Sequence, residues 1–417
     1  MAEKADRLVV LLDAPELGPS RRVGTLVRWP GRGRGAVSFE YDEGWLRSKS
    51  SFPIDPRTPL FSGDHHYGTD TLPPALKDTT PDAWGERLLS RAAGRALSSW
   101  EMLMAVSDET RMGALRLGTS PEGPFIADGS PYVPPMATLR DLQELARLVE
   151  EDPDVDLDGS RFRDLIVPGS SLGGARPKAN VRDTDGSLWI AKFPSRDDRR
   201  LDIGAWEYVY ARLAQSAGIH VAEHRLIAVN GKGRGRTFLA RRFDRDAVGG
   251  RRLYVSAMTL TDHRDGDDGS YPDIAQAISR NVATSAVKTD FAQMFRRLVF
   301  NVVAGNRDDH LRNHGFLRTP EGWRLAPAFD MNPAREAHRH SLSIDGSSDA
   351  QDPATALATH RLYALDERDA RRITAEVVRA VAGWEAEAIA AGIGEGERQV
   401  VSAAFTELDA AEQLGAA

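Results

Sequence analysis

The chain contains 417 residues, of which 41% are hydrophobic and 28% charged, and its formal net charge is −7. This length exceeds one ordinary hydrophobic core and predicts two or three domains or lobes. The absence of cysteine excludes disulfides, cysteine-ligated zinc, iron–sulfur clusters and thiol catalysis, and it favours a cytoplasmic location.

The acidic balance of the chain does not favour general electrostatic binding to nucleic acid. No apolar run approaches the roughly 20 residues that are needed to span a bilayer, so no membrane partner is predicted. The apolar run at residues 8–12 is short, acidic residues flank it and no small-residue cleavage site follows, which argues against a signal peptide.

The amino-terminal part of the chain predicts short strands followed by helices. Turn signals separate three strand-like segments, which are residues 8–12, 24–28 and 36–41. Apolar residues at helical spacing predict a helix over residues 82–105 that starts at Asp82. Residues 117–136 are rich in glycine, proline and serine and predict a linker or a long surface loop. An amphipathic helix follows over residues 138–151, with Thr138 as its expected cap.

The middle of the chain predicts a β-hairpin, a helix and two more strands. Residues 179–182 and 188–193 flank a turn that ends in Asp185-Gly186, a typical hairpin arrangement. A helix is expected over residues 202–217. The two further strands are expected at residues 222–229 and 237–243.

Helices dominate beyond residue 256. The expected helices are residues 271–279, 290–303, 367–382 and 384 to the carboxyl end. This order predicts an α+β, bilobal protein-kinase-like fold with a β-rich amino-terminal lobe and an all-helical carboxyl-terminal lobe. The predicted division is a β-rich subdomain with helices (1–115), a kinase amino-terminal lobe with a Gly-rich loop (116–255) and a helical lobe with the catalytic loop (256–417).

Residues 305–316 carry the most informative motif. Asp308 and Asn313 have the Asp-x-x-x-x-Asn spacing of a kinase catalytic loop, and Asp330 follows 17 residues after Asn313. Asp308 is the predicted base for a substrate hydroxyl, and Asn313 and Asp330 are the predicted ligands of Mg²⁺, a cation that prefers oxygen donors. Asp309 is the alternative base. The competing interpretation is a polar turn whose side chains cap local backbone.

A glycine-rich segment precedes this loop by more than 130 residues. Ser171, Gly173 and Gly174 lie in a stretch whose backbone N–H groups could approach the phosphates of ATP. The motif is not Walker A, so a glycine-rich surface turn is the alternative. Arg176 and Lys178 follow and could reach the triphosphate, or else form a solvated basic edge.

Lys192 lies within an apolar segment, Trp189-Ile190-Ala191-Lys192-Phe193. A lysine is unfavourable to bury there unless it is paired, and kinases use a strand lysine to bind the α- and β-phosphates. Glu207, 15 residues later in a predicted helix, is the candidate partner. The alternatives are a lysine that points to solvent and an exposed helix position for Glu207.

Other metal and hydrolase interpretations are weaker. His310 and His314 have the i, i+4 spacing of a zinc helix, but the metalloprotease glutamate is missing between them. His310 is instead expected to contact the γ-phosphate or to steady the loop. His338 and His340 are interpreted as surface residues. No Gly-x-Ser-x-Gly elbow is present.

Taken together, these motifs resemble the HipA family of bacterial Ser/Thr kinases, the toxins of toxin–antitoxin pairs, over nearly the whole chain. The catalytic motif is similar at residues 306–316, the metal motif at 325–333 and the Ser-x-x-Gly-x-x-x-Lys loop at 171–178. The strand lysine falls on Lys192. Residues 76–89, with Asp82-Ala83-Trp84-Gly85, resemble the amino-terminal signature of the family.

The resemblance implies further roles for individual residues. His310, Lys178 and Lys192 match nucleotide contacts. Arg241 and Phe243 match the hinge that contacts adenine through backbone atoms, although the family often has glutamate where this chain has Arg241. Ser171 matches a serine that is autophosphorylated, and Ser170 is a neighbouring candidate. A phosphate there would add about two negative charges to a phosphate-binding loop and is expected to switch the kinase off.

The function implied by the resemblance is transfer of the ATP γ-phosphoryl group to a protein serine or threonine. The family's characteristic targets are aminoacyl-tRNA synthetases, so the expected outcome is blocked translation and growth arrest. The expected partner is a small helix-turn-helix antitoxin of the HipB type, and DNA would be contacted only through it. The alternatives are a small-molecule or lipid kinase and a non-catalytic corepressor module.

Overall fold

The computed structural model describes residues 6–29, 35–127, 133–152, 176–198, 201–229, 235–334, 339–350 and 352–416. The chain folds into two compact units. Unit 1 consists of Met1–Ala191, Arg242–Val255 and Leu317–Pro320, and unit 2 consists of Lys192–Arg241, Ser256–Phe316 and Glu321–Ala417. No helix among the described residues is long and apolar enough to cross a membrane.

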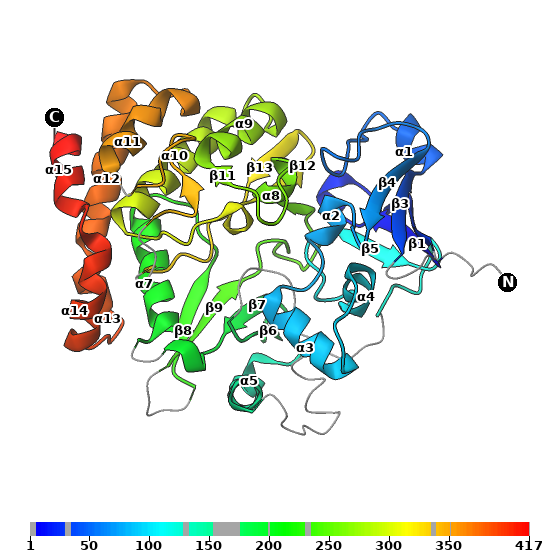
Figure 1. Cartoon of the computed structure of the whole chain (residues 1–417), viewed down its shortest axis with the longest axis horizontal. Coiled ribbons are helices and arrows are strands. Elements are labelled where there is room, and N and C mark those ends of the chain that lie inside the picture. Colours follow the sequence, from blue (N-terminus) through cyan, green and yellow to red (C-terminus); the bar gives the residue numbers. More distant parts are fainter. Residues whose placement is uncertain are drawn as a thin grey trace. The chain divides into compact units, whose positions relative to one another are not determined.

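Unit 1 contains a five-stranded antiparallel sheet (Figure 1). Its strands are β1 (Asp6–Leu12), β2 (Arg21–Trp29), β3 (Ala36–Tyr41), β4 (Asp64–Thr69) and β5 (Leu115–Gly118), in the order β4-β3-β2-β1-β5. Leu8, Leu26, Phe39 and His65 lie opposite one another across four strands and are all buried. Alternation along each strand places such a row on one face of the sheet, and the three strands predicted here are confirmed.

Five helices lie among the described residues in the amino-terminal part of unit 1. They are α1 (Glu43–Arg47), α2 (Pro74–Lys77), α3 (Ala83–Ala93), α4 (Ser99–Ala105) and α5 (Leu139–Glu151), with short 3₁₀ turns η1 (Pro15–Leu17) and η2 (Met136–Thr138). The single helix expected over residues 82–105 is two helices. Gly94 ends α3 with a φ of 65°, and Ser98 starts α4 by a capping box with Glu101. Asp82 caps α3 as predicted, since its carboxylate accepts the Gly85 N–H at 2.9 Å.

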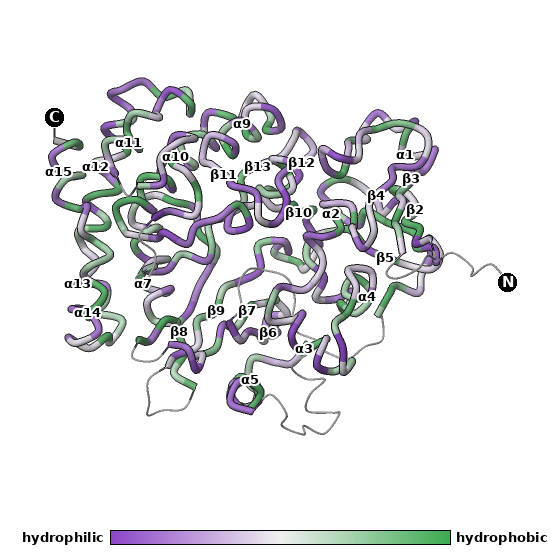
Figure 2. Tube along the Cα trace, in the orientation of Figure 1, coloured by the Kyte–Doolittle hydropathy of each residue, from purple (hydrophilic) through white to green (hydrophobic). Residues whose placement is uncertain are grey.

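Helix α5 is amphipathic, with buried Leu139, Leu142 and Leu145 on one side, and Figure 2 shows its hydrophobic and hydrophilic sides. The expected side-chain cap at Thr138 is wrong, because the Thr138 hydroxyl donates to the Pro135 carbonyl instead. Strands β6 (Lys178–Arg182) and β7 (Leu188–Lys192) form the expected hairpin. Gly186 adopts a φ of 86° in the turn between them.

Unit 2 contains nine of the described helices. They are α7 (Ile203–Ser216), α8 (Ala257–Leu260), α9 (Tyr271–Asn281), α10 (Val287–Val303), α11 (Pro353–Ala358), α12 (Glu367–Ala382), α13 (Trp384–Ala390), α14 (Glu395–Val401) and α15 (Leu408–Ala416). Helix α10 is the central one, because it packs against α9, α11 and α12 and buries most of its residues. Helix α7 packs against α12 and α13. The Asp202 carboxylate caps α7 by accepting the Ala205 N–H.

The strands β8 (His224–Ile227), β9 (Thr237–Arg241) and β10 (Tyr254–Ser256) precede Ala257, and β8 and β9 confirm the two strands predicted at residues 222–229 and 237–243. The lobe that was expected to be all-helical also contains strands, which are β11 (Gly269–Ser270), β12 (Gly315–Thr319), β13 (Gly322–Leu325) and β14 (Leu342–Ser343). β8 and β9 pair as an antiparallel hairpin, and β11 and β14 pair in parallel. The described residues after β7 also form the 3₁₀ turns η3 (Arg196–Asp198), η4 (Leu311–Asn313), η5 (Thr359–Tyr363) and η6 (Ser402–Phe405).

Candidate active site

The first cluster of predicted site residues forms around Lys192, at the end of β7. Its ammonium nitrogen lies 2.5 Å from a carboxylate oxygen of Glu207 on α7 and 2.6 Å from one of Asp330. The side chains of Lys192 and Glu207 are 7% and 4% exposed, whereas that of Asp330 is 19% exposed. The structure therefore brings together three predicted residues that span 138 positions of the sequence.

Burial alone would lower the pKa of Lys192, because it penalises the ammonium ion. The charges of Asp330 and Glu207 outweigh that effect, so the pKa is raised and Lys192 is protonated throughout the physiological range. The positive charge of Lys192 is enclosed by Glu207 on one side and is more open on the side of Asp330. This arrangement is suited to hold an anionic group such as a phosphate.

The polar loop begins where α10 ends. Gly305 has a φ of 66°, and a β-carbon at this position would overlap the carbonyl group of Ala404. Glycine satisfies both conditions, because other residues adopt a positive φ only at a cost and the Ala404 carbonyl leaves no space for a β-carbon. The chain thus leaves the helix axis at Gly305, and residues 306–313 form the loop that carries Asp308.

Asp308 and Asp309 are neighbours in this loop but have opposite surroundings. Asp308 is exposed, and its pKa is raised by partial desolvation and by the nearby charges of Asp330 and Asp309, with His310 opposing this shift. Asp309 is 3% exposed and its carboxylate is held by internal donors. The alternative base, Asp309, is therefore disfavoured by geometry, whereas Asp308 is accessible to a substrate hydroxyl.

Asn313 and Asp330 fit the donor set of a hard cation. The Asn313 amide nitrogen donates to the Asp308 carbonyl at 3.1 Å, which fixes the side chain, and its amide oxygen is buried without a hydrogen-bond partner among the described residues. An oriented amide oxygen of this kind is a suitable magnesium ligand. Asp330 has a φ of 60°, a left-handed conformation that aspartate tolerates better than most residues.

His310 is half-buried, and its Nδ1 atom is buried without a hydrogen-bond partner among the described residues. His314 does not join it, because its Nε2 lies 2.7 Å from the Asp309 carboxylate. The zinc arrangement that the i, i+4 spacing suggested is therefore not formed. The parts of the chain that the structure describes hold no group of three or more His, Cys, Asp or Glu side chains placed to bind a metal.

The remaining predicted contacts divide between the two units. Lys178 belongs to unit 1, where it is 2% exposed and lies 2.7 Å from Asp82. Phe243 also belongs to unit 1, with its ring 5.9 Å from that of Tyr254. Arg241 belongs to unit 2, and its N–H donates to the Glu223 carbonyl. A hinge contact from Arg241 would therefore have to come from its carbonyl oxygen, and all three nucleotide contacts stay predictions.

The glycine-rich loop lies outside the described residues. Ser170, Ser171, Gly173 and Gly174 all fall in residues 153–175. Their predicted roles in phosphate binding and autophosphorylation therefore stay predictions.

Sequence reasoning missed the polar network that holds Asp309. Its members are Tyr271, Asn301, Asn306 and His314. Asn306 and His314 stood inside the recognised motif without an assigned role, and Asn301 was visible as a polar residue at the end of an apolar helix. Tyr271 gave no signal, because it lies 38 residues before Asp309.

The interpretation of His340 as a surface residue is wrong. Its side chain is buried, at 4% exposure, and neither ring nitrogen has a hydrogen-bond partner among the described residues. Burial lowers its pKa to about 4, with Arg307 adding to the shift and Asp309 opposing it. His340 is therefore neutral at pH 7.

A second cluster of buried charges lies in unit 1 around Asp244, which is fully buried. Its carboxylate accepts hydrogen bonds from Arg242, Arg245 and the Gly113 N–H. Arg242 also donates to Asn180 on β6. Burial would raise the pKa of Asp244, but the two guanidinium groups outweigh it and lower the pKa. This cluster joins residues 110–113 to the segment after β9.

Comparison with known families assigns the two halves of the sequence. Residues 18–118 match the HipA N-terminal domain, and residues 170–384 match the HipA-like C-terminal domain. The second match alone covers more than half of the chain. The chain belongs to the HipA family. The family predicted from the loop motifs is therefore confirmed.

Relatives of this HipA chain are named as kinases. A Sinorhizobium fredii protein named "Putative kinase Y4dM" is 29% identical over 40% of this chain, and the match spans 39% of that protein's length. The serine/threonine-protein kinase toxin HipA of Shewanella oneidensis is 24% identical, with 70% of this chain and 69% of that protein covered.

The fold of this HipA chain also matches a solved structure. A chain in the complex of Shewanella oneidensis HipA, HipB and operator DNA has a TM-score of 0.67 at 20% identity, with 97% of this chain and 96% of that chain covered. At this identity the match concerns the fold alone. The α+β, kinase-like fold predicted from the sequence is confirmed.

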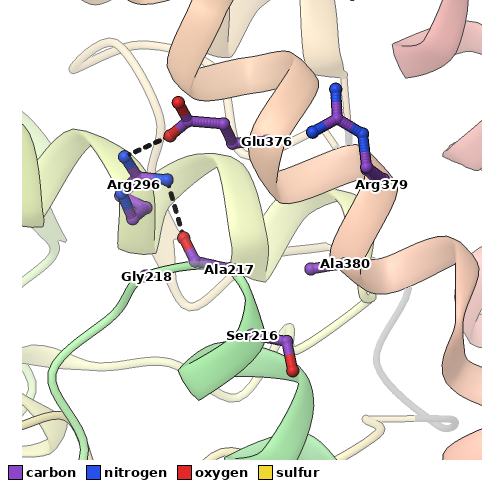
Figure 3. A pocket seen from close by; sticks show the side chains of 7 residues that line it. All are labelled: Ser216, Ala217, Gly218, Arg296, Glu376, Arg379 and Ala380. Carbon is purple, nitrogen blue, oxygen red and sulfur yellow. Dashed lines mark hydrogen bonds and ion pairs between the residues drawn. The ribbon is translucent and has the colours of Figure 1, made fainter.

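A pocket of about 380 Å³ lies elsewhere in unit 2 of the HipA chain, where the end of α7 meets α10 and α12 (Figure 3). Arg296 braces its wall, since its guanidinium donates to the Ala217 carbonyl and to Glu376, each at 2.6 Å. The other lining residues are Ser216, Gly218, Arg379 and Ala380. None of the lining residues belongs to the predicted active site.

Proposed function

We propose that this HipA-family chain is an ATP-dependent serine/threonine protein kinase. The observation that carries the proposal is the enclosure of Lys192 between Glu207 and Asp330, in the same unit as the exposed Asp308. A lysine that is paired to a helix glutamate, and a metal-site aspartate beside it, are the parts that phosphoryl transfer requires.

The proposed chemistry assigns one task to each side chain. Lys192 binds the phosphates of ATP, while Asp308 accepts the proton of the substrate hydroxyl as its oxygen attacks the γ-phosphorus. The bond between that phosphorus and the bridging oxygen breaks, and ADP leaves. Asn313 and Asp330 would hold Mg²⁺, which neutralises the charge of the transferring group. The raised pKa of Asp308 is favourable to a general base, provided that it stays ionised at the working pH.

The substrate and partner are proposed by similarity to the family. We propose that the phosphoryl acceptor is a serine or threonine of an aminoacyl-tRNA synthetase, so that the reaction blocks translation and growth. We also propose a HipB-like helix-turn-helix antitoxin as the partner, through which the chain contacts operator DNA. The fold match to a HipA, HipB and operator DNA complex supports this assignment.

The test is phosphoproteomics after brief induction of the wild type and of Asp308→Ala. The wild type is expected to add phosphate to a discrete protein, and the variant is expected to lose about 10²–10⁴-fold of this activity. Asp308→Ala should still bind the antitoxin, because the carboxylate is exposed and has no hydrogen bond or ion pair among the described residues. Full toxicity in the variant would reject the mechanism, and labelled lipid or metabolite in place of protein would reject the substrate class.

A further inference from the structure

Beneath the catalytic loop lies a buried polar network that the proposed chemistry does not use. One carboxylate oxygen of Asp309 accepts hydrogen bonds from the Tyr271 hydroxyl at 2.7 Å and the Asn301 amide at 2.9 Å, and the His314 Nε2 lies 2.7 Å from it. The four residues are at most 3% exposed. A single oxygen thus collects donors from α9, from α10 and from the residue that follows the loop.

The network continues to the segment that holds the second site aspartate. The Asn306 amide donates to the Asn301 side-chain oxygen at 3.0 Å, and the Asn306 side-chain oxygen accepts the Asn332 N–H at 3.3 Å. Asn332 lies two residues after Asp330. A continuous path of hydrogen bonds therefore connects the residue next to Asp308 with the segment that carries Asp330.

Hydrogen-bond donors offset the unfavourable free energy of burying the Asp309 carboxylate. Burial would raise the pKa of Asp309, yet the pKa is lowered, chiefly by His314 and by the hydrogen bonds of His314 and Tyr271. An ionised carboxylate inside the protein is strongly destabilising without such donors. The carboxylate therefore cannot leave this position without losing them, and the loop backbone on both sides is fixed with it.

We propose that Asp309 is a positioning residue, which aims Asp308 at the substrate and keeps the loop aligned with the Asp330 segment. The inference rests on the proposed kinase function and deepens it. Asp308 and Asp309 are adjacent, so their side chains leave the backbone in different directions. Anchoring the second carboxylate inward to Tyr271, Asn301 and His314 directs the first one outward.

The direct test is Asp309→Asn, which keeps the shape of the side chain but removes the negative charge to which the donors of Tyr271, Asn301 and His314 are directed. We expect the turnover number of the folded protein to fall by about 10²-fold, the loss associated with a reacting group displaced by about 1 Å. The dissociation constant for ATP should change less than about threefold, because Lys192 and Glu207 are not among the donors. Wild-type turnover in folded Asp309→Asn would overturn the proposal, and so would a loss confined to nucleotide binding.

A matched pair of variants covers the case in which Asp309→Asn does not fold. Tyr271→Phe removes a buried hydroxyl that donates to Asp309, whereas Tyr363→Phe removes a buried hydroxyl that has no hydrogen-bond partner among the described residues. We expect Tyr271→Phe to lower turnover up to about tenfold with an unchanged KM for ATP, since it removes one charge-assisted hydrogen bond. Tyr363→Phe should leave turnover unchanged. Equal turnover in the two variants would contradict the proposal.

Hydrogen exchange separates failure of this inference from failure of the proposed kinase function. The Asn313 N–H donates to the His310 carbonyl at 2.8 Å inside the loop. Its exchange should be faster in Tyr271→Phe than in Tyr363→Phe if the network positions the loop, whether or not the protein is a kinase. Equal exchange would overturn the positioning role, whereas full activity of Asp308→Ala would overturn only the kinase mechanism.

Discussion

The two clusters of buried charge in this molecule use aspartate in different ways. In unit 1, the carboxylate of Asp244 is fully buried and is shared by two arginines and a backbone N–H. In unit 2, the side chain of Asp330 is 19% exposed, one of its carboxylate oxygens lies 2.6 Å from Lys192, and its backbone adopts a left-handed conformation. The first carboxylate is fully buried among its donors, whereas the second is partly exposed.

The difference indicates which buried charges are structural and which are chemical. A carboxylate that is surrounded by matched donors contributes to the fold and has no capacity left for a substrate. A carboxylate that is partly exposed, lies beside a buried lysine and has an uncommon backbone conformation is suited to binding. Perturbed pKa values occur in both clusters, so the pKa alone does not distinguish them.

The largest effect is expected when Lys192 is replaced by methionine. The change leaves the buried Glu207 without its cation, so the free energy of unfolding should fall by about 3–5 kcal/mol. Turnover should fall by a further 10²–10³-fold, on the order of the loss of one preorganised electrostatic contact. Phosphate transfer to the protein substrate, normalised to the folded fraction, measures the second effect.

The control for this variant is Lys192→Arg, which retains the charge between Glu207 and Asp330. It should recover most of the stability but little of the turnover, because a guanidinium group has a different shape and donor geometry from an ammonium group. Recovery of full turnover by Lys192→Arg would show that only the charge matters at this position.

A loss of stability without a loss of chemistry is expected for Asp244→Asn. The substitution leaves Arg242 and Arg245 uncompensated, and the free energy of unfolding should fall by about 3–5 kcal/mol. The turnover of the folded fraction should stay within about threefold of the wild type. Denaturant unfolding and kinetics on the same sample test this. A turnover loss comparable to that of Lys192→Met would break the contrast between the two clusters.

A smaller effect on stability is expected from protonation of His340, which is buried and has no hydrogen-bond partner for its ring among the described residues. Its folded-state pKa of about 4 lies below its unfolded value. The unfolded chain therefore binds the proton first, so the stabilising contribution is complete above about pH 6.5 and is lost as the pH falls toward 4. The free energy of unfolding should fall by about 2–3 kcal/mol over this window, and the decrease should be absent in His340→Phe. Parallel pH profiles for the two proteins would contradict the assignment.

Local signals in the sequence explain which parts of the fold could be predicted. The strand at residues 36–41 was predicted with its observed bounds because polar and apolar side chains alternate without interruption over residues 37–41. The helix break at Gly94 was missed, although Ser98 and Glu101 form a capping-box spacing that was present in the sequence. The strands β12 and β13 were missed because they are short and lie within a region dominated by helical patterns.

The residues of the candidate site also divide into those that could be predicted from the sequence and those that could not. The spacing of Asp308, Asn313 and Asp330 could be recognised because the proposed chemistry needs those residue types in that order. The role of Asp309 was not, because its burial depends on Tyr271 and Asn301, which reach it only through the packing of α9 and α10. Such a network is a product of the tertiary fold and has no periodic signature.

The left-handed backbone at Asp330 restricts which replacements can silence this protein without unfolding it. Alanine or glutamate would change the proposed magnesium ligand and also strain the turn, whereas asparagine and glycine adopt this conformation readily. Asparagine also leaves Lys192 balanced by Glu207. A folded, inert version of the chain, suitable for trapping its protein partners, is therefore best made by exchanging a single oxygen for nitrogen at position 330.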